Sequence, residues 1–440
     1  MFSFRRLNAF PSPSWRAWGD AEGTRAAMRS LPRLLLLCLM LLSACAPKVD
    51  EDTVVLWTAF DGIELSTLQR RLAEFQSTTG QKVVVLKVPF NNLRQKVLVA
   101  SPARQGPDLL IGPHDWVGLL QTADLLSPIP SDIISAEDLS FYPIAKEAVT
   151  FGGQIYSAPM MMECVVLARN TDLCPTKPES LEQLVSEAVA CQEKNPGVGG
   201  FGYQLENLYF SWPFLAGHGA DFLSPLKAPT LDVDALQFDT PEAVAGCDWI
   251  ADLGDRKYKL VPRDMNNDVA VELFLKGRQG MILCGPWNMG AIRSSGVPYA
   301  LDPLPPGPVK ASSPFVGVTG VMIGRHSAEK KGVKEVVAYL ASPEVTAELC
   351  QSAARAPTRI ETATALKGLV SDPVVAKDLA LFATAAQSGT PMPNHPAMSA
   401  AVNTSMAGAL QLITTNQVDT AEELKRTTER VRAKIRFMTE

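Results

Sequence analysis

The stretch TVVLWTAFDGIELSTLQRRLAEFQSTTGQKVVVLKVPFNNLRQKVLVASPARQGPDLLIG, residues 53–112, decides the fold. Its apolar runs TVVLWTAF, KVVVLKVPF and PDLLIG are typical of strands. Between the first two, the spacing of Leu65, Leu68, Leu72 and Phe75 predicts one apolar helix face, which ends at Gly80. LRQKVLVAS predicts a second helix. This alternation indicates an α/β fold with a mostly parallel sheet flanked by helices.

The same alternation resumes after about residue 163. VVLARN (165–170) and GFGYQL (200–205) predict strands on either side of a helix over residues 179–195. FVGVTGVMIG (315–324) predicts a further strand, a helix is expected over 328–342, and residues 374–440 favour helix almost throughout. We therefore expect two α/β units joined by several chain crossings.

Ligands of such sheets bind beyond the carboxyl ends of the strands. Asp61 follows the first strand, and Asp115 and Trp116 follow the third. In FLKGRQGMILCGPWNMG, residues 274–290, Pro286 ends the predicted strand and Trp287 follows in a turn. A tryptophan at this position either folds back into the core or offers a flat platform to a ligand.

The N-terminal region predicts export. Arg29 and Arg33 precede the apolar run LLLLCLMLL (34–42), so residues 1–45 resemble a secretory signal peptide, and the run is too short for a stable membrane span. LSAC, ending at Cys45, resembles the bacterial lipobox, whose cysteine is lipidated; an ordinary secretory signal is the alternative. We expect translation to begin at Met28, residues 46–52 to form a tether, and the product to be a periplasmic or cell-surface lipoprotein.

Composition and charge argue against nucleic acid as a partner. Hydrophobic residues make up 46% of the chain and charged residues 20%, as in ordinary globular proteins. Removing residues 1–45 removes six arginines and two acids, which leaves 35 basic and 44 acidic residues and a net charge of −9. An acidic chain without basic runs argues against nucleic acid.

The cysteines follow the expected compartment. Six remain after residue 45, and an oxidising environment permits disulfides between them. Cys174 with Cys191 is the pair we favour, because the first lies in a loop and the second near the end of the next helix. Cys247 with Cys284 is a weaker alternative, and the full pairing, which also involves Cys164 and Cys350, stays open.

Motifs for cofactors or catalysis are weak. GVGGFG (197–202) spells a dinucleotide fingerprint but follows a predicted helix and precedes a strand, the reverse of what that site requires. Neither the cysteines nor the four histidines have metal-ligand spacing, so no metal and no cofactor is expected. Convergence of Asp61, Asp115 and Glu163 leaves a carboxylate glycosidase as the enzymatic alternative.

Several segments together carry a family resemblance. They are WTAFDG, GPDLLIGPHDWVG, GGQIYSAPMMMECVVLARNTDL, LENLYFSWPFLAGHGADF, FLKGRQGMILCGPWNMG, SPFVGVTGVMIG and MPNHPAMSA. In this order, they make the chain from about residue 53 onward similar to extracellular solute-binding proteins of the maltose/maltodextrin-binding type.

The resemblance implies a two-lobed periplasmic-binding-protein fold of type II with discontinuous lobes. The N-terminal lobe would comprise residues 53–160 plus 316–366, and the C-terminal lobe residues 164–314 plus 370–440. A three-segment hinge would cross near 159–163, 315–319 and 366–373. A monomer would then capture a sugar between its lobes, close over it, and deliver it to the permease of an ABC importer.

The resemblance also implies ligand-binding residues. Asp61, Asp115 and Glu163 match acids that accept hydrogen bonds from sugar hydroxyls, and Tyr209 and Trp287 match aromatic residues that pack on the sugar. Each also has a structural interpretation: a helix cap, a solvated charge or a core residue.

Departures from the family pattern point to a short sugar. Gly112-Pro113 and Ala400-Ala401-Val402 replace two stacking aromatics, Asn207 replaces an acid, and Gly62 replaces a lysine. Trp116 replaces a basic residue and is expected to restore one ring. The predicted ligand is a disaccharide or short oligosaccharide, with trehalose as suitable as maltose. A sugar-sensing partner of a membrane receptor is the alternative to the non-enzymatic importer.

Overall fold

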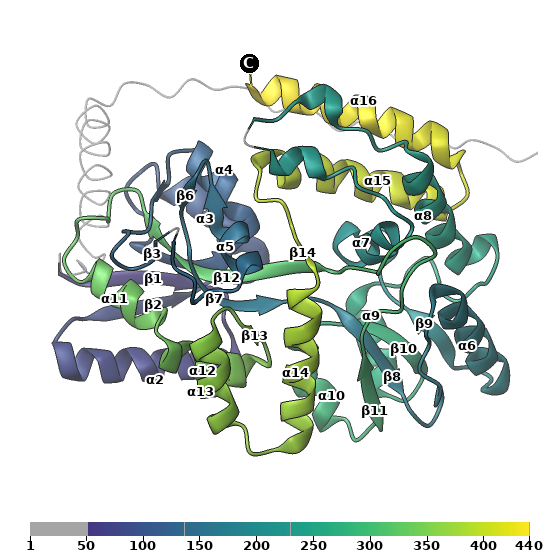
Figure 1. Cartoon of the computed structure of the whole chain (residues 1–440), viewed down its shortest axis with the longest axis horizontal. Helices are drawn as coiled ribbons and strands as arrows, with labels where there is room; N and C mark the ends of the chain where they lie inside the picture. The colour runs from purple at the N-terminus through teal and green to yellow at the C-terminus, as the bar shows by residue number, and fades with distance from the viewer. Residues whose placement is uncertain (1–51, 136, 229, 440) are drawn as a thin grey trace, which may run out of the picture. The chain divides into compact units, whose positions relative to one another are not determined.

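The computed structural model describes residues 52–135, 137–228 and 230–439 (Figure 1). The predicted signal peptide, Cys45 and most of the tether lie outside these residues. The opening elements are β1 (Val54–Thr58), α2 (Gly62–Thr79), β2 (Val83–Lys87), α3 (Phe90–Ala100) and β3 (Leu109–Pro113). Leu68, Leu72 and Phe75 are buried on one face of α2, as predicted. The helix ends at Gly80, whose φ of 75° suits a residue without a Cβ.

The first sheet is mixed rather than mostly parallel, which corrects the sequence prediction. Its order is β13-β7-β12-β3-β1-β2, and β1 pairs in parallel with β2 and β3. However, β12 (Phe315–Gly324) runs antiparallel to β3 and to β7 (Ala158–Glu163). The chain leaves this sheet along β7 and returns along β12, so two neighbouring strands that carry it out and back must run in opposite directions.

The second sheet holds four strands in the order β11-β8-β10-β9. They are β8 (Val166–Asn170), β9 (Gly199–Gly202), β10 (Gln279–Cys284) and β11 (Tyr299–Asp302). β9 and β10 are parallel, whereas β8 is antiparallel to both of its neighbours. The chain enters this sheet between residues 163 and 166 and leaves it between 302 and 315.

Helices and short strands complete the architecture. They are α4 (Val117–Thr122), β4 (Leu126–Ser127), α5 (Pro143–Val149), β5 (Thr150–Phe151), β6 (Gln154–Ile155), α6 (Leu181–Lys194), α7 (Leu208–Gly217), α8 (Pro241–Ala251), α9 (Asn267–Leu275), α10 (Met289–Ser294), α11 (Val333–Leu340), α12 (Pro343–Ala353), β13 (Ala356–Pro357), α13 (Ile360–Leu369), α14 (Pro373–Gln387), β14 (Thr390–Pro391), α15 (Asn403–Thr414) and α16 (Thr420–Thr439). α14 contacts β7 and β13 of the first sheet and β11 of the second (Figure 1). α15 and α16 pack on α8.

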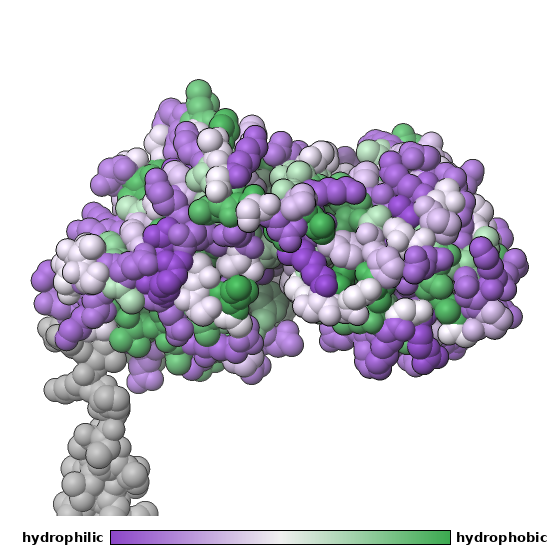
Figure 2. Space-filling view, turned by 90° about the horizontal axis from the view of Figure 1, so that it is seen from below, coloured by the Kyte–Doolittle hydropathy of each residue, from purple (hydrophilic) through white to green (hydrophobic). Residues whose placement is uncertain are grey.

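The surface is that of a protein exposed to water. On the face in Figure 2, polar residues predominate and apolar residues form small separate patches. Within the part of the chain that the structure describes, no helix combines the length and the apolar character needed to cross a bilayer.

Candidate ligand-binding site

Asp61 lies where the sequence places it, at the carboxyl end of β1, but it is already engaged. Its Oδ1 accepts a hydrogen bond from the N–H of Gly62 at 2.7 Å, so it caps α2. Lys87 Nζ lies 2.5 Å from the same oxygen, and the Asp61 side chain is 75% exposed. Its bond to Lys87 and then its bond to Gly62 lower its pKa. Asp61 is therefore an ionised carboxylate at the protein surface.

Asp115 is the buried acid that follows β3. The residue lies in the short helix η2 (His114–Trp116) and is 9% exposed. Burial raises its pKa to about 6; the nearby Arg94 opposes this rise, and the carboxylate of Glu163 adds to it. The influence of Glu163, at the end of β7, shows that two of the predicted acids share one neighbourhood.

Trp116 does not provide the exposed ring predicted for it. The residue is 4% exposed and packs in a core cluster with Trp57 and Leu93. Gly112 lets it fold back, because a Cβ on Gly112 would lie 3.2 Å from the indole ring. Phe90, 58% exposed with its ring 5.5 Å from that of Trp116, is the aromatic that reaches solvent here.

Glu163 shares an arginine with a second carboxylate that the sequence analysis missed. Arg355 Nε lies 3.0 Å from Glu163 Oε2, and Arg355 Nη1 lies 3.2 Å from Glu64 Oε1. The guanidinium also lies over the ring of Phe60, 5.8 Å from its centroid. All three charged side chains are less than 20% exposed. Ala354, at the end of α12, has a left-handed φ of 54°, which turns the chain just before Arg355.

These ion pairs lack hydrogen-bond geometry. Glu64 Oε1, Glu163 Oε2 and Arg355 Nε are buried, and none makes a hydrogen bond despite the short distances. The hydroxyl of Tyr209 is also buried and makes no hydrogen bond. Buried polar atoms are nearly always satisfied in folded proteins, so a group of unsatisfied ones suggests a missing partner.

Tyr209 joins this cluster from α7. Burial is the main cause that raises its pKa well above 10, and the charge of Glu163 contributes. Asn207 Oδ1 accepts a hydrogen bond from the Tyr209 N–H at 3.0 Å, so Asn207 caps α7 and positions Tyr209. This capping role satisfies the amide oxygen of Asn207 without a ligand.

Trp287 lies beside Tyr209 and remains open to solvent. It sits in the short helix η6 (Pro286–Asn288) after β10, and its ring centroid is 6.3 Å from that of Tyr209. The indole folds over Gly285, where a Cβ would lie 2.3 Å from it. Trp287 is 41% exposed, so the ring lies at the surface rather than in the core. In contrast, Trp212 is 3% exposed and stacks on Phe315, as a core residue does.

His114 is a structural residue of the same region. Its Nδ1 accepts the N–H of Val318 at 2.9 Å, so its Nε2 carries the proton and donates to the Met392 carbonyl at 2.8 Å. Burial lowers its pKa to about 4. This neutral histidine ties the turn that carries Asp115 to β12 and to the segment after β14.

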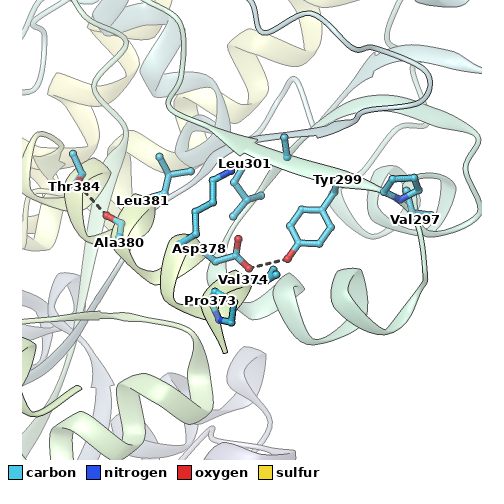
Figure 3. A pocket seen from close by; sticks show the side chains of 12 residues that line it. Val297, Tyr299, Leu301, Pro373, Val374, Asp378, Ala380, Leu381 and Thr384 are labelled. Atoms are coloured by element: carbon cyan, nitrogen blue, oxygen red, sulfur yellow. Dashed lines mark hydrogen bonds between the residues drawn. The ribbon is translucent and has the colours of Figure 1, made fainter. Parts of the chain in front are cut away.

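A cavity lies outside this cluster of residues. It has a volume of about 780 Å³ and opens between β11 and α14, lined by Val297, Tyr299, Leu301 and Leu381 among others (Figure 3). Its acid, Asp378, accepts two hydrogen bonds from Arg293 and one from the Tyr299 hydroxyl. Because one oxygen of this carboxylate, Oδ2, already accepts three hydrogen bonds, we place the candidate site at the Glu163–Arg355 cluster instead. Among the described residues, no group of three acids, cysteines or histidines is arranged to hold a metal ion.

Comparisons with known proteins agree with this architecture. The family model for the bacterial extracellular solute-binding protein matches residues 70–383. A maltotriose-binding protein of Pyrococcus abyssi is 27% identical over 79% of this chain and 74% of its own length. A galactooligosaccharide-binding protein of Bacillus subtilis is 25% identical over 90% of this chain and 94% of its own length.

A solved structure of the Thermus thermophilus maltotriose binding protein, bound with maltotriose, superimposes with a TM-score of 0.75. It is 29% identical, and the match covers 87% of this chain and all of that one. The two-lobed periplasmic-binding fold is thereby confirmed. Since the family model matches well over half of its residues, this chain belongs to the bacterial extracellular solute-binding protein family.

Proposed function

We propose that the chain is the sugar-binding lipoprotein of an ABC-type importer. The observation that carries this proposal is the cluster in which Glu163, Arg355 and Tyr209 hold buried polar atoms without hydrogen bonds beside the exposed ring of Trp287. A sugar has both the hydroxyl groups that would satisfy these atoms and the apolar C–H face that packs on an aromatic ring.

The position of the cluster supports a mechanism by closure. Glu163 and Arg355 come from the first-sheet segments β7 and the loop before β13, whereas Tyr209 and Trp287 come from segments of the second-sheet half. The proposed lobes are residues 53–160 plus 316–366 and residues 164–314 plus 370–440. A ligand that touches both favours the closed form, because the open form offers only part of its contacts.

The exposed aromatic rings bear on the size of the sugar. Trp287 and Phe90 are exposed, whereas Trp116 is buried. Few exposed rings fit a disaccharide or short oligosaccharide, with maltose, trehalose, maltotriose and short galactosides as the candidates. We further propose anchoring through Cys45 after export, a monomeric state, and delivery to a membrane permease.

Catalysis is not part of the proposal. One arginine already pairs with both Glu64 and Glu163, and the family to which the chain belongs is one of solute-binding proteins. Incubation with each candidate sugar should therefore leave it intact; release of monosaccharide that is lost in Glu163→Gln would favour the enzymatic alternative.

The direct test is a thermal-shift screen of the lipid-free chain, residues 46–440, against these sugars. At about 100 times the dissociation constant, binding adds about 2.7 kcal/mol of stability, which raises the midpoint by several degrees. We expect a shift with one sugar class that falls to about half in Trp287→Ala, because tenfold weaker binding leaves about 1.4 kcal/mol of stabilisation at the same sugar concentration. A shift of undiminished size in Trp287→Ala, or no shift with any sugar, would contradict the proposal.

A further inference from the structure

Two cysteines of the second-sheet half lie against the same glycine. Cys174 follows β8 in a loop, and Cys191 lies in the last turn of α6. A Cβ built on Gly280 of β10 would lie 2.5 Å from Cys174 Sγ and 2.6 Å from Cys191 Sγ. The two sulfur atoms are therefore at most 5.1 Å apart.

Both cysteines are held firmly in place. Arg169 Nη1 donates to the carbonyls of Cys174 at 2.8 Å and Pro175 at 2.7 Å, and its Nε is bonded to the buried Asp302. The Asn195 amide donates to the carbonyl of Cys191 at 2.9 Å. Cys174 is 2% exposed and Cys191 is 4% exposed. Gly280 leaves the space that the two sulfur atoms occupy, and a larger residue would remove it.

The remaining described cysteines have different surroundings. Cys284 lies near Cys164 and Asp378, whereas Cys247 lies near Tyr203. The weaker sequence prediction, Cys247 with Cys284, is therefore not supported. All six cysteines are free thiols in this structure.

We propose that Cys174 and Cys191 form a disulfide in the exported protein. Two S–H bonds are lost and one S–S bond forms; the two electrons and two protons pass to a disulfide-bearing oxidant protein of the export compartment, whose own disulfide becomes a dithiol. Because both sulfurs are buried once folding is complete, exchange takes place during folding.

This bond would stabilise the start of β10, the strand that precedes Trp287. It closes the loop between residues 174 and 191 beside Gly280, whereas Trp287 lies beyond the other end of the strand. Its main effect is therefore expected on stability rather than on ligand affinity. The proposal rests on export but not on sugar binding.

Peptide mapping tests it directly. The chain, produced with its own leader in a bacterial periplasm, is denatured in iodoacetamide without reductant and digested. We expect a linked peptide pair holding Cys174 and Cys191, lighter by two hydrogens than the two free peptides, and alkylation at Cys164, Cys247, Cys284 and Cys350. Alkylation of both Cys174 and Cys191 in the periplasmic protein would overturn the proposal.

A second measurement separates failure of export from failure of the bond. The lipid-free chain, produced reduced, is refolded in a glutathione redox buffer and melted with and without reductant. Reductant should lower the midpoint of the wild type by roughly 3 to 6 °C, and should not affect Cys174→Ser/Cys191→Ser. The control Cys247→Ser should respond like the wild type. A wild-type midpoint that ignores reductant would contradict the bond, whatever the cell exports.

Discussion

Two buried acids in this molecule, Glu163 and Asp378, differ in how well they are partnered. Asp378 in α14 receives three hydrogen bonds, from Arg293 and Tyr299, beside an open cavity. Glu163 faces Arg355 at 3.0 Å without hydrogen-bond geometry, close to the unsatisfied hydroxyl of Tyr209. The first arrangement holds α14 to the second sheet. In the second, our proposal is that a ligand supplies the missing bonds.

The largest effect is expected from removing Arg355. Arg355→Ala leaves Glu64 and Glu163 without their counter-charge, so the free energy of unfolding should fall by about 3–5 kcal/mol. Urea denaturation measures this loss. The control is Arg263→Ala, which removes an exposed surface ion pair with Asp255 and should cost under about 1 kcal/mol. Equal losses in the two variants would show that Arg355 is an ordinary surface charge.

Amide substitutions at the two acids should separate binding from stability. Glu163→Gln should weaken sugar binding by about 1.5–3 kcal/mol, since a charged acceptor is lost, and should cost less stability than Arg355→Ala, because Glu64 still pairs with Arg355. Asp378→Asn should lower stability by about 1–3 kcal/mol and leave affinity intact. Isothermal titration measures the sugar affinity of each variant, and denaturation measures its stability. The reverse pattern would move the binding site to the cavity beside α14.

Trp287→Ala should reduce affinity by about 1.5 kcal/mol, roughly tenfold, because the sugar loses its stacking surface. Stability should change little, since the ring is 41% exposed. The matched control is Trp249, whose ring centroid lies 4.9 Å from that of Phe214 in α7. Trp249→Ala should destabilise the fold and keep the affinity; a weaker ligand affinity in this variant than in Trp287→Ala would refute the assignment.

The smallest effect is a pH dependence of affinity. Burial raises the pKa of Asp115 to about 6, and a sugar hydroxyl that donates to its carboxylate favours the ionised form. Affinity is therefore complete above that pKa and lost as pH falls through it, roughly fourfold between pH 7.5 and 5.5. Titrations across this range should show the fall, and Asp115→Asn should bind weakly at every pH. A wild-type affinity independent of pH would remove Asp115 from the contact set.

Much of the fold was predictable because buried strands leave strong local patterns. The apolar runs gave β1, β3 and β12, and the spacing of Leu68, Leu72 and Phe75 gave the buried face of α2. Strand direction was not predictable in this way. β12 is buried along nine of its ten residues, a pattern usual for parallel strands, yet it is antiparallel because it brings the chain back from the second sheet.

The candidate site was only partly predictable. Asp115, Glu163, Tyr209 and Trp287 lie in segments with a family pattern, and the structure brings them near one another. Glu64 and Arg355 were missed, because a charge on an amphipathic helix and a charge after a helix end both resemble solvated residues in sequence. Only the turn at Ala354 places Arg355 between the two carboxylates. Trp116 was misjudged, since nothing local shows that Gly112 lets its ring fold inward.

The most direct measurement is a crystal structure of the lipid-free chain with the sugar that gives the largest thermal shift. We expect the sugar to pack on Trp287, with its hydroxyls bonded to Glu163, Arg355 and Tyr209, so that the unsatisfied atoms gain partners. A sugar bound instead between β11 and α14, beside Asp378, would contradict this central claim.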